Sequence, residues 1–330
     1  SPKPVDELRR DARAEVEKAR RSNRAIVFEM GHSSVAEHAV FNIDVIGVSR
    51  LLVEEIEKFR LCSYTEKSQR YVLFDRDFVV PDEIREAGLA GVFIETVEMQ
   101  NDLYHRLYGE LKPYVFDRNQ SLANEPASKS MLEGWAKEDA RYAIALATET
   151  QLGMTINARN LELMLRRLAA LPLAEARLYS EKLYAATRDI APSLIRYTEA
   201  TPYDRLTRQN LKFRAEKVLQ RHPARHGRRR GADVTLISHT PKADEQTLAA
   251  LLFSASRVGF DSCRKEASRL SPRTATGIFK TMLENAASYD AVLRELENVD
   301  LQFEMEISAS CFAQMKRHRM ATLITQDYDP

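Results

Sequence analysis

Residues 31–71 read GHSSVAEHAVFNIDVIGVSRLLVEEIEKFRLCSYTEKSQRY, and this stretch organises the rest of the chain. It opens with a turn of small and polar residues that includes His32 and Glu37. The run 40–48 is rich in β-branched and aromatic residues, which predicts a strand. Leucine and isoleucine side chains at helical spacing over 51–56 then predict a short amphipathic helix. A turn, a strand and a helix in this order set the framework for the polar residues that follow.

A dense polar cluster closes the stretch. It combines guanidiniums, hydroxyls and a carboxylate from Arg60, Ser63, Glu66, Ser68, Gln69 and Arg70. Arginine binds a phosphate through two hydrogen bonds, and hydroxyls can fill the remaining acceptors, so the cluster suits an anionic small molecule such as a nucleotide phosphate. Clusters of this composition also occur on solvated faces of proteins, and the residues alone leave that alternative open.

The order of these elements resembles the hallmark of flavin-dependent thymidylate synthases. That family carries Gly-His-x-Ser-x-x-Glu-His, then a strand that ends in Ser-Arg, then an Arg-His-Arg signature followed by Ser and Arg-Tyr. The residues that match are Gly31, His32, Ser34, Glu37, His38, Ser49, Arg50, Arg60, Ser68, Arg70 and Tyr71. The chain departs from the signature at Lys58-Phe59-Arg60, where the imidazole is missing and an ammonium replaces a bidentate guanidinium.

Two later segments also resemble the family. Glu138-Asp139-Ala140-Arg141 matches Glu-x-Ala-Arg, and Asn157-Ala158-Arg159 matches Asn-Ala-Arg. The resemblance implies that Arg141 contacts deoxyuridylate (dUMP) and that Asn157 and Arg159 contact the flavin. Without the resemblance, charged residues in a helical region are usually exposed or salt-bridged. A further substrate-binding arginine of the family falls at Leu168 in this chain, and the neighbouring Arg166 and Arg167 could replace it after a small shift.

Composition limits the class of protein. The 330 residues are enough for about two domains. With 11 Gly and 12 Pro beside abundant Ala, Leu, Glu and Arg, a helix-rich fold is expected. A net charge of +1 gives no general attraction to nucleic acid or to a membrane. The 3 cysteines, odd in number and far apart, indicate neither a disulfide framework nor a metal site, so a cytoplasmic protein is expected.

Other catalytic patterns are absent from the sequence. His32, Glu37 and His38 lack the His-Glu-x-x-His spacing of a zinc helix, and no metal is expected. There is no nucleophile elbow for Ser-His-Asp catalysis. No glycine-rich dinucleotide fingerprint is present, so a bound flavin would not be held in the Rossmann manner.

Strand runs followed by helix runs indicate an α+β fold, and the resemblance implies a small, mostly antiparallel sheet with long packed helices in each copy. The expected helices are 5–28, 82–114, an interrupted helical region from 131 to about 219, 244–256 and 274–287. The expected strands are 40–48, 71–80, 233–238 and 301–307. Residues 221–232, RHPARHGRRRGA, lack interleaved aromatics and are interpreted as a basic linker rather than a nucleic-acid site.

After the linker the sequence repeats the opening stretch. Ser308 aligns with Ser49, Gln314 with Glu55, and Arg317-His318-Arg319 with Lys58-Phe59-Arg60. The predicted domains are therefore a first copy over 1–220, the linker over 221–232 and the start of a second copy over 233–330. The strand at 233–238 has no counterpart in the first copy, and both ends of the chain are expected to be truncated.

Each copy lacks what the other keeps, because the second has the intact Arg-His-Arg but carries Asp327 where the signature Ser falls. In the resembled family, sites form where the subunits of a homotetramer meet. A tandem chain could combine both copies in one site, and a homo-oligomer that mimics the tetramer as a dimer of tandem chains is expected. The alternative is a degenerate paralogue that binds nucleotide or flavin, or that has a structural or regulatory role.

The resemblance implies the chemistry and the roles of single residues. Reduced FAD delivers hydride, methylenetetrahydrofolate supplies the carbon that converts dUMP to dTMP, NADPH reduces the flavin, and Cys62 is a buried structural thiol rather than a nucleophile. The implied catalytic residues are Arg60, Ser68, Arg317, His318 and Arg319. The implied dUMP contacts are Glu66, Ser68, Gln69, Arg70, Arg141 and Gln314. The implied FAD contacts are His32, Ser34, Glu37, Asn157, Arg159, Arg317, His318 and Arg319.

Overall fold

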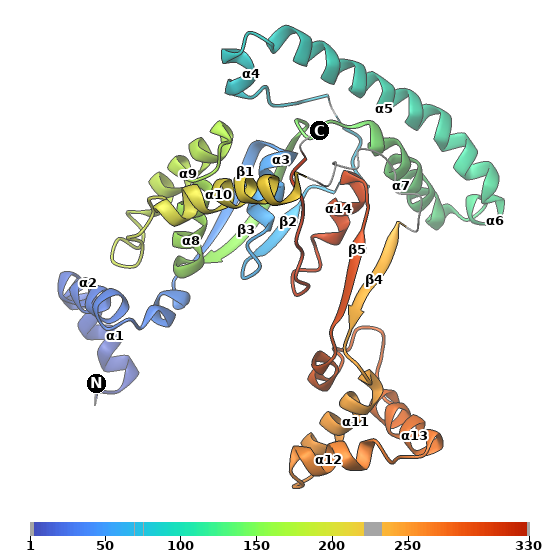
Figure 1. Cartoon of the computed structure of the whole chain (residues 1–330). Coiled ribbons are helices and arrows are strands. Elements are labelled where there is room, and N and C mark those ends of the chain that lie inside the picture. Colours follow the sequence, from blue (N-terminus) through green and yellow to red (C-terminus); the bar gives the residue numbers. More distant parts are fainter. Residues whose placement is uncertain (1–2, 69, 75, 221–232, 329–330) are drawn as a thin grey trace. The chain divides into compact units, whose positions relative to one another are not determined.

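The computed structural model describes residues 3–68, 70–74, 76–220 and 233–328 (Figure 1). The chain divides into one compact unit of Ser1–Pro223 with Ala309–Pro330 and a second of Ala224–Ser308. Residues 309–328, called the C-terminal segment below, thus group with the first unit, although the sequence places them in the second copy. The basic linker 221–232 and Gln69 lie outside the described residues.

A three-stranded antiparallel sheet forms the framework of the first unit. Its strands are β1 (Val40–Ser49), β2 (Ser63–Glu66) and β3 (Glu149–Asn157), in the order β1-β3-β2. Gly47 adopts a φ of +73° at a register shift in β1, where only glycine avoids strain. The strand predicted over 40–48 is confirmed.

One face of the sheet is buried under helices. Alternate side chains of β1 and β3, such as Val45 and Met154, join a core with α3 (Arg50–Glu57), α8 (Ala158–Leu168) and α9 (Ala174–Thr187). This follows from the period of two along a strand, which sends every second side chain to the same face. The helix predicted over 51–56 is confirmed as α3.

The cap of α3 explains why β1 turns directly into a helix. The Ser49 hydroxyl accepts a hydrogen bond from the backbone amide of Leu52 at 3.1 Å, which satisfies one of the unpaired first-turn donors. The same hydroxyl donates to Glu175 Oε2 at 2.5 Å, so the cap is tied to α9. Asn157 caps α8 in the same way, by accepting from the Asn160 amide at 2.9 Å.

Two predicted elements are wrong. The region 131–219 was expected to be helical with interruptions, but it contains β3, the central strand of the sheet. The run 71–80 was expected to be a strand, but within its described residues the structure has an isolated bridge between Phe78 and Thr148. The third strand is β2, inside the predicted polar cluster, because its backbone pairs with β3.

The remaining helices of the first unit begin with α1 (Val5–Ala14) and α2 (Val16–Arg24), which lead through a π-helical turn (Ala25–Glu29) to the 3₁₀-helix Ser33–His38. The long helix α5 (Ala90–Arg118), seen in cyan in Figure 1, packs on α7 (Lys129–Ala140) around Val115, Leu132 and Ala136. Short helices flank α5: α4 (Asp82–Glu86), α6 (Gln120–Ala123) and the 3₁₀ turns Pro126–Ser128 and Arg141–Ala143. The unit also contains α10 (Pro202–Leu219) and α14 (Ala309–Met315).

The second unit combines a two-stranded antiparallel ribbon with helices. The ribbon pairs β4 (Val234–His239) with β5 (Leu301–Met305), and strands were expected at both places. The helices α11 (Ala243–Ser254), α12 (Phe260–Ala267) and α13 (Pro272–Leu283), with the 3₁₀ turn Arg294–Asn298, surround a small core at Leu248, Ala249 and Ala267. The expected α+β class, with small antiparallel sheets and long helices, is confirmed, whereas the duplication stays a prediction. Among the described residues, no helix is long and apolar enough to span a membrane.

Candidate functional site

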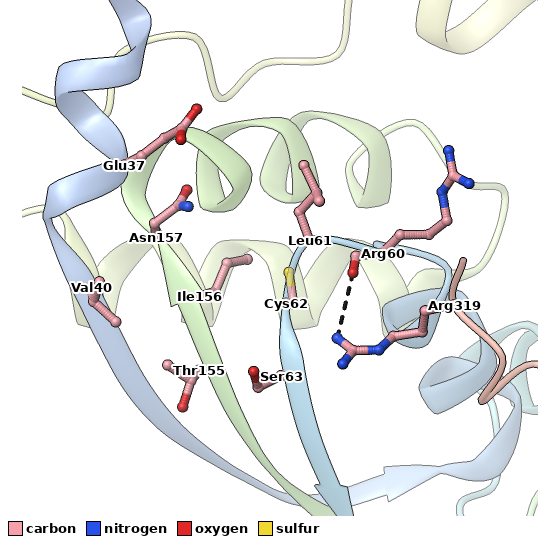
Figure 2. A pocket seen from close by; sticks show the side chains of 10 residues that line it. All are labelled: Glu37, Val40, Arg60, Leu61, Cys62, Ser63, Thr155, Ile156, Asn157 and Arg319. Atoms are coloured by element: carbon pink, nitrogen blue, oxygen red, sulfur yellow. Dashed lines mark hydrogen bonds between the residues drawn. The ribbon is translucent and has the colours of Figure 1, made fainter. Parts of the chain in front are cut away.

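A pocket of about 320 Å³ opens beside the end of β3 (Figure 2). Its polar lining comes from separate parts of the first unit: Glu37 on the 3₁₀-helix, Asn157 at the end of β3, Arg60 before β2, and Arg319 in the C-terminal segment. The Arg319 guanidinium donates to the backbone carbonyl of Arg60 at 3.4 Å. Figure 2 shows this guanidinium turned toward the pocket, whereas the Arg60 side chain extends away from Asn157. Two guanidiniums and one carboxylate give the lining a net positive charge.

An ion pair joins Glu37 of the pocket lining to another predicted residue, Arg159. Arg159 on α8 pairs with Glu37, and both side chains are about half exposed. The pair holds the start of α8 against the 3₁₀-helix, while Asn157 is fixed by its role as the cap of α8. The structure therefore brings together four of the residues predicted to contact FAD, Glu37, Asn157, Arg159 and Arg319. His32 and Ser34 lie exposed on the same turn but do not line the pocket.

A second group of charges lies buried beneath the C-terminal segment. Arg141 is only 3% exposed, and its Nη2 lies 3.5 Å from Glu138 Oε1 and 3.5 Å from the Ser310 carbonyl oxygen. No described residue accepts a hydrogen bond from its Nε or Nη1 atom. Arg50 is also buried, and burial lowers its pKa from the ordinary arginine value, with the Arg141 charge adding to the effect. A buried guanidinium with unsatisfied donors is costly and suits an anionic ligand.

Ion pairs tie the C-terminal segment to the carboxylates of this group. Lys316 Nζ lies 2.8 Å from Glu57 Oε2, and both side chains are less than a tenth exposed. Arg317 lies 3.3 Å from Glu66, and the Tyr328 hydroxyl donates to Glu54 at 2.8 Å. These contacts position Arg319 in the pocket.

Glu66 titrates abnormally in this setting. Burial raises the pKa of its carboxyl, and the negative charge of Glu57 raises the pKa further. The cations Lys316, Arg317 and Arg50 oppose the rise but do not cancel it. Glu66 therefore holds its proton to a higher pH than an exposed glutamate does.

Other predicted residues lie outside both groups. The Arg70 backbone amide donates to the Ser68 hydroxyl at 3.3 Å, and the Arg70 guanidinium lies over the Tyr71 ring. Gln314 lies half-buried on α14, and His318 is exposed. Gln69, the remaining predicted dUMP contact, cannot be placed because it is outside the described residues.

The signature residues that depart from the family serve the fold. Phe59 packs against the main core at the position of the missing imidazole, and Lys58 pairs with Glu55 within α3. Cys62 is 4% exposed, and burial raises the pKa of its thiol, so the thiol stays protonated and inert. The structure thus places Cys62 as the buried thiol that the sequence predicts.

Several residues of the buried group were missed from the sequence. Glu54, Glu57, Lys316 and Tyr328 belong to no recognised motif, and their partners are distant in the chain. The signal in the sequence that could have singled out this pair is the repeat alignment, which places Glu57 and Lys316 at equivalent positions with opposite charges.

Comparison with known proteins gives a consistent result. Residues 1–193 match the family model described as thymidylate synthase complementing protein. The chain is 30% identical to a flavin-dependent thymidylate synthase of Clostridium tetani over 203 residues, 60% of this chain and 77% of that protein. It is 31% identical to one of Pyrococcus furiosus over 137 residues, which covers 40% of this chain and only 47% of that protein.

Solved structures give a weaker similarity. Flavin-dependent thymidylate synthase ThyX from Helicobacter pylori, complexed with FAD and dUMP, aligns with a TM-score of 0.41 and 19% identity. The alignment covers 55% of this chain and 84% of that chain.

Proposed function

The chain belongs to the thymidylate synthase complementing protein family, and on that premise we propose that it is a flavin-dependent thymidylate synthase. The proposed reaction is the methylation of dUMP to dTMP, with FAD as the bound cofactor and methylenetetrahydrofolate and NADPH as co-substrates. When bound, the reduced flavin supplies hydride to the methyl carbon that the folate contributes.

The observation that carries the proposal is the meeting of Asn157 and Glu37 with Arg319 in one pocket. Asn157 and Glu37 belong to motifs of the first copy, and Arg319 belongs to the Arg-His-Arg of the second. The pocket volume of about 320 Å³ lies within the range of small-molecule sites, and its positive charge fits the diphosphate of FAD. The site is therefore proposed to combine the two copies in one chain.

The roles of the chain's own residues follow from their positions. Arg319 would bind and orient the anionic part of FAD, and Asn157 would donate a hydrogen bond from its amide nitrogen, since its oxygen already caps α8. Arg141, with two unpaired nitrogens, would bind the phosphate of dUMP beside Arg50. Family sites form between subunits, so a dimer of tandem chains is part of the proposal.

A second candidate function is favoured by specific observations. Phe59 takes the place of the imidazole and packs into the core, and Arg141 is sealed from solvent beneath the Ser310 carbonyl. A degenerate paralogue that binds nucleotide or flavin, or that acts through its contacts alone, would have the same features.

The absorbance spectrum of the purified chain, titrated with FAD and then with dUMP, separates the two candidates. The enzyme predicts a bound-flavin band that dUMP perturbs, and turnover of dUMP to dTMP when folate and NADPH are added. A chain that retains no flavin at saturating FAD, or that binds FAD but does not turn over dUMP, is the degenerate relative.

A further inference from the structure

Two contacts of the C-terminal segment join positions that are equivalent in the aligned copies. The alignment of Lys58-Phe59-Arg60 with Arg317-His318-Arg319 makes Glu57 the equivalent of Lys316 and Arg60 the equivalent of Arg319. The structure pairs Lys316 with Glu57 at 2.8 Å, and Arg319 donates to the Arg60 carbonyl at 3.4 Å. Each residue thus contacts its own counterpart.

Contact between counterparts indicates a two-fold axis. In an isologous interface, a residue on the axis meets the same residue of the other copy. The local structure agrees, because α3 and α14 begin at equivalent positions, Arg50 and Ala309, and each follows a strand. Both observations are what a pseudo-two-fold axis near Glu57 and Arg60, relating segments 50–66 and 309–328, would produce.

The residue on such an axis decides which copies can pair. Two first copies would place two Glu57 carboxylates against each other, and two second copies would do the same with Lys316. Like charges in a site this buried are strongly unfavourable, whereas in the unlike pair each charge offsets the other. Contacts away from the axis also disfavour a pair of two second copies. In such a pair, Thr325 would replace Glu66 as the partner of Arg317, and Ala313 would replace Glu54 as the partner of Tyr328.

We propose that segments 50–66 and 309–328 form a pseudo-two-fold interface in which Glu57 and Lys316 are a charge match that admits unlike copies and excludes like ones. This inference rests on the internal repeat that the proposed function uses. The occupant of the 50–66 surface is the segment 309–328 of the same chain or of a second chain, and not another 50–66 surface.

A charge exchange in the full chain tests the proposal. The variants are Glu57→Lys, Lys316→Glu and the double variant E57K/K316E, each compared by hydrogen exchange of peptides within 309–328. Each single variant creates a buried like pair and is expected to raise exchange at least about tenfold, and the double variant to return it to near the wild-type rate. The matched control is Lys112→Glu, whose ion pair with Glu133 has the same 2.8 Å length but lies exposed between α5 and α7, and it should leave the segment unchanged.

Mixing the E57K chain with the K316E chain gives an independent readout. Exchange of segments between these two chains restores an unlike pair at both interfaces, so native mass spectrometry should show a 1:1 complex that neither chain forms alone. Wild-type protection in the single variants, or no recovery in the double variant, overturns the proposal. If the double variant recovers protection from hydrogen exchange but binds no FAD, the proposed interface stands and the proposed function fails. The two outcomes are therefore distinguishable.

Discussion

The ammonium of Lys316 lies 2.8 Å from the carboxylate of Glu57, and both side chains are less than a tenth exposed. This pair fixes the C-terminal segment on the first unit just before Arg319, which enters the pocket beside Arg60. A contact between two charges distant in sequence therefore determines the composition of the candidate site. The predictions below test what each part of this arrangement does.

Arg319→Met should weaken binding of FAD about tenfold or more, because a charge-assisted hydrogen bond is worth about 1.5–3 kcal/mol. Flavin fluorescence during titration of the protein measures the change. Arg294→Met is the control, since Arg294 pairs with Glu297 on the exposed surface of the second unit. Equal loss of affinity in both variants would contradict a role for Arg319 in the pocket.

Arg141→Met should separate binding from stability. The variant should lose at least about tenfold in dUMP affinity by calorimetry, because the proposed phosphate contact is gone. Its free energy of unfolding should stay the same or rise, because the substitution removes a buried guanidinium with two unsatisfied nitrogens. A large destabilisation with unchanged dUMP affinity would assign Arg141 a purely structural role.

Glu66→Gln should alter the pH dependence of stability. The folded pKa of Glu66 is raised, so this carboxyl contributes stability that is present below its unfolded value near 4.5 and is lost as pH rises through the folded pKa. In the variant, the free energy of unfolding should fall less as the pH rises above 4.5. Urea unfolding curves at a series of pH values measure this dependence. Glu133→Gln should instead reduce the loss of stability as the pH falls, because the hydrogen bond from Lys112 lowers the pKa of Glu133.

Ser49→Ala should destabilise the first unit by about 1–2 kcal/mol, because it removes both the α3 cap and the hydrogen bond to Glu175. Thermal unfolding measures the effect. Ser271→Ala removes a cap at the exposed start of α13, and its cost should be smaller. Equal costs for the two variants would show that the link to α9 contributes nothing.

The sequence predicted the elements whose pattern is local. The strand β1 and the helix α3 follow from a β-branched run and from apolar spacing, and both are where they were expected. The strand β3 was missed because Leu152 and Met154 are good helix formers between two helices, and pairing with β1 and β2 overrides that preference. The run 71–80 has strand-like composition, but among its described residues Phe78 forms an isolated bridge, with Thr148, in place of a paired strand.

The candidate site was predictable in part for the same reason. The residues Glu37, Asn157 and Arg159 sit in motifs with fixed spacing, and the structure brings them together. The buried pair of Glu57 and Lys316 depends on the folding of the chain back onto itself, which no local period records. The alignment of the two copies makes these positions equivalent, but their contact was not predicted from the sequence.

The first unit is discontinuous in sequence, because the whole second unit lies between its two parts. During synthesis, the sheet and the helices that cover it are complete long before residues 309–328 leave the ribosome. Until then Glu57 and Glu66 have no cation from the C-terminal segment, and Arg141 is not covered by Ser310. Closure of this long loop therefore follows the folding of residues 1–220, and the pocket matures only after residues 309–328 have been made.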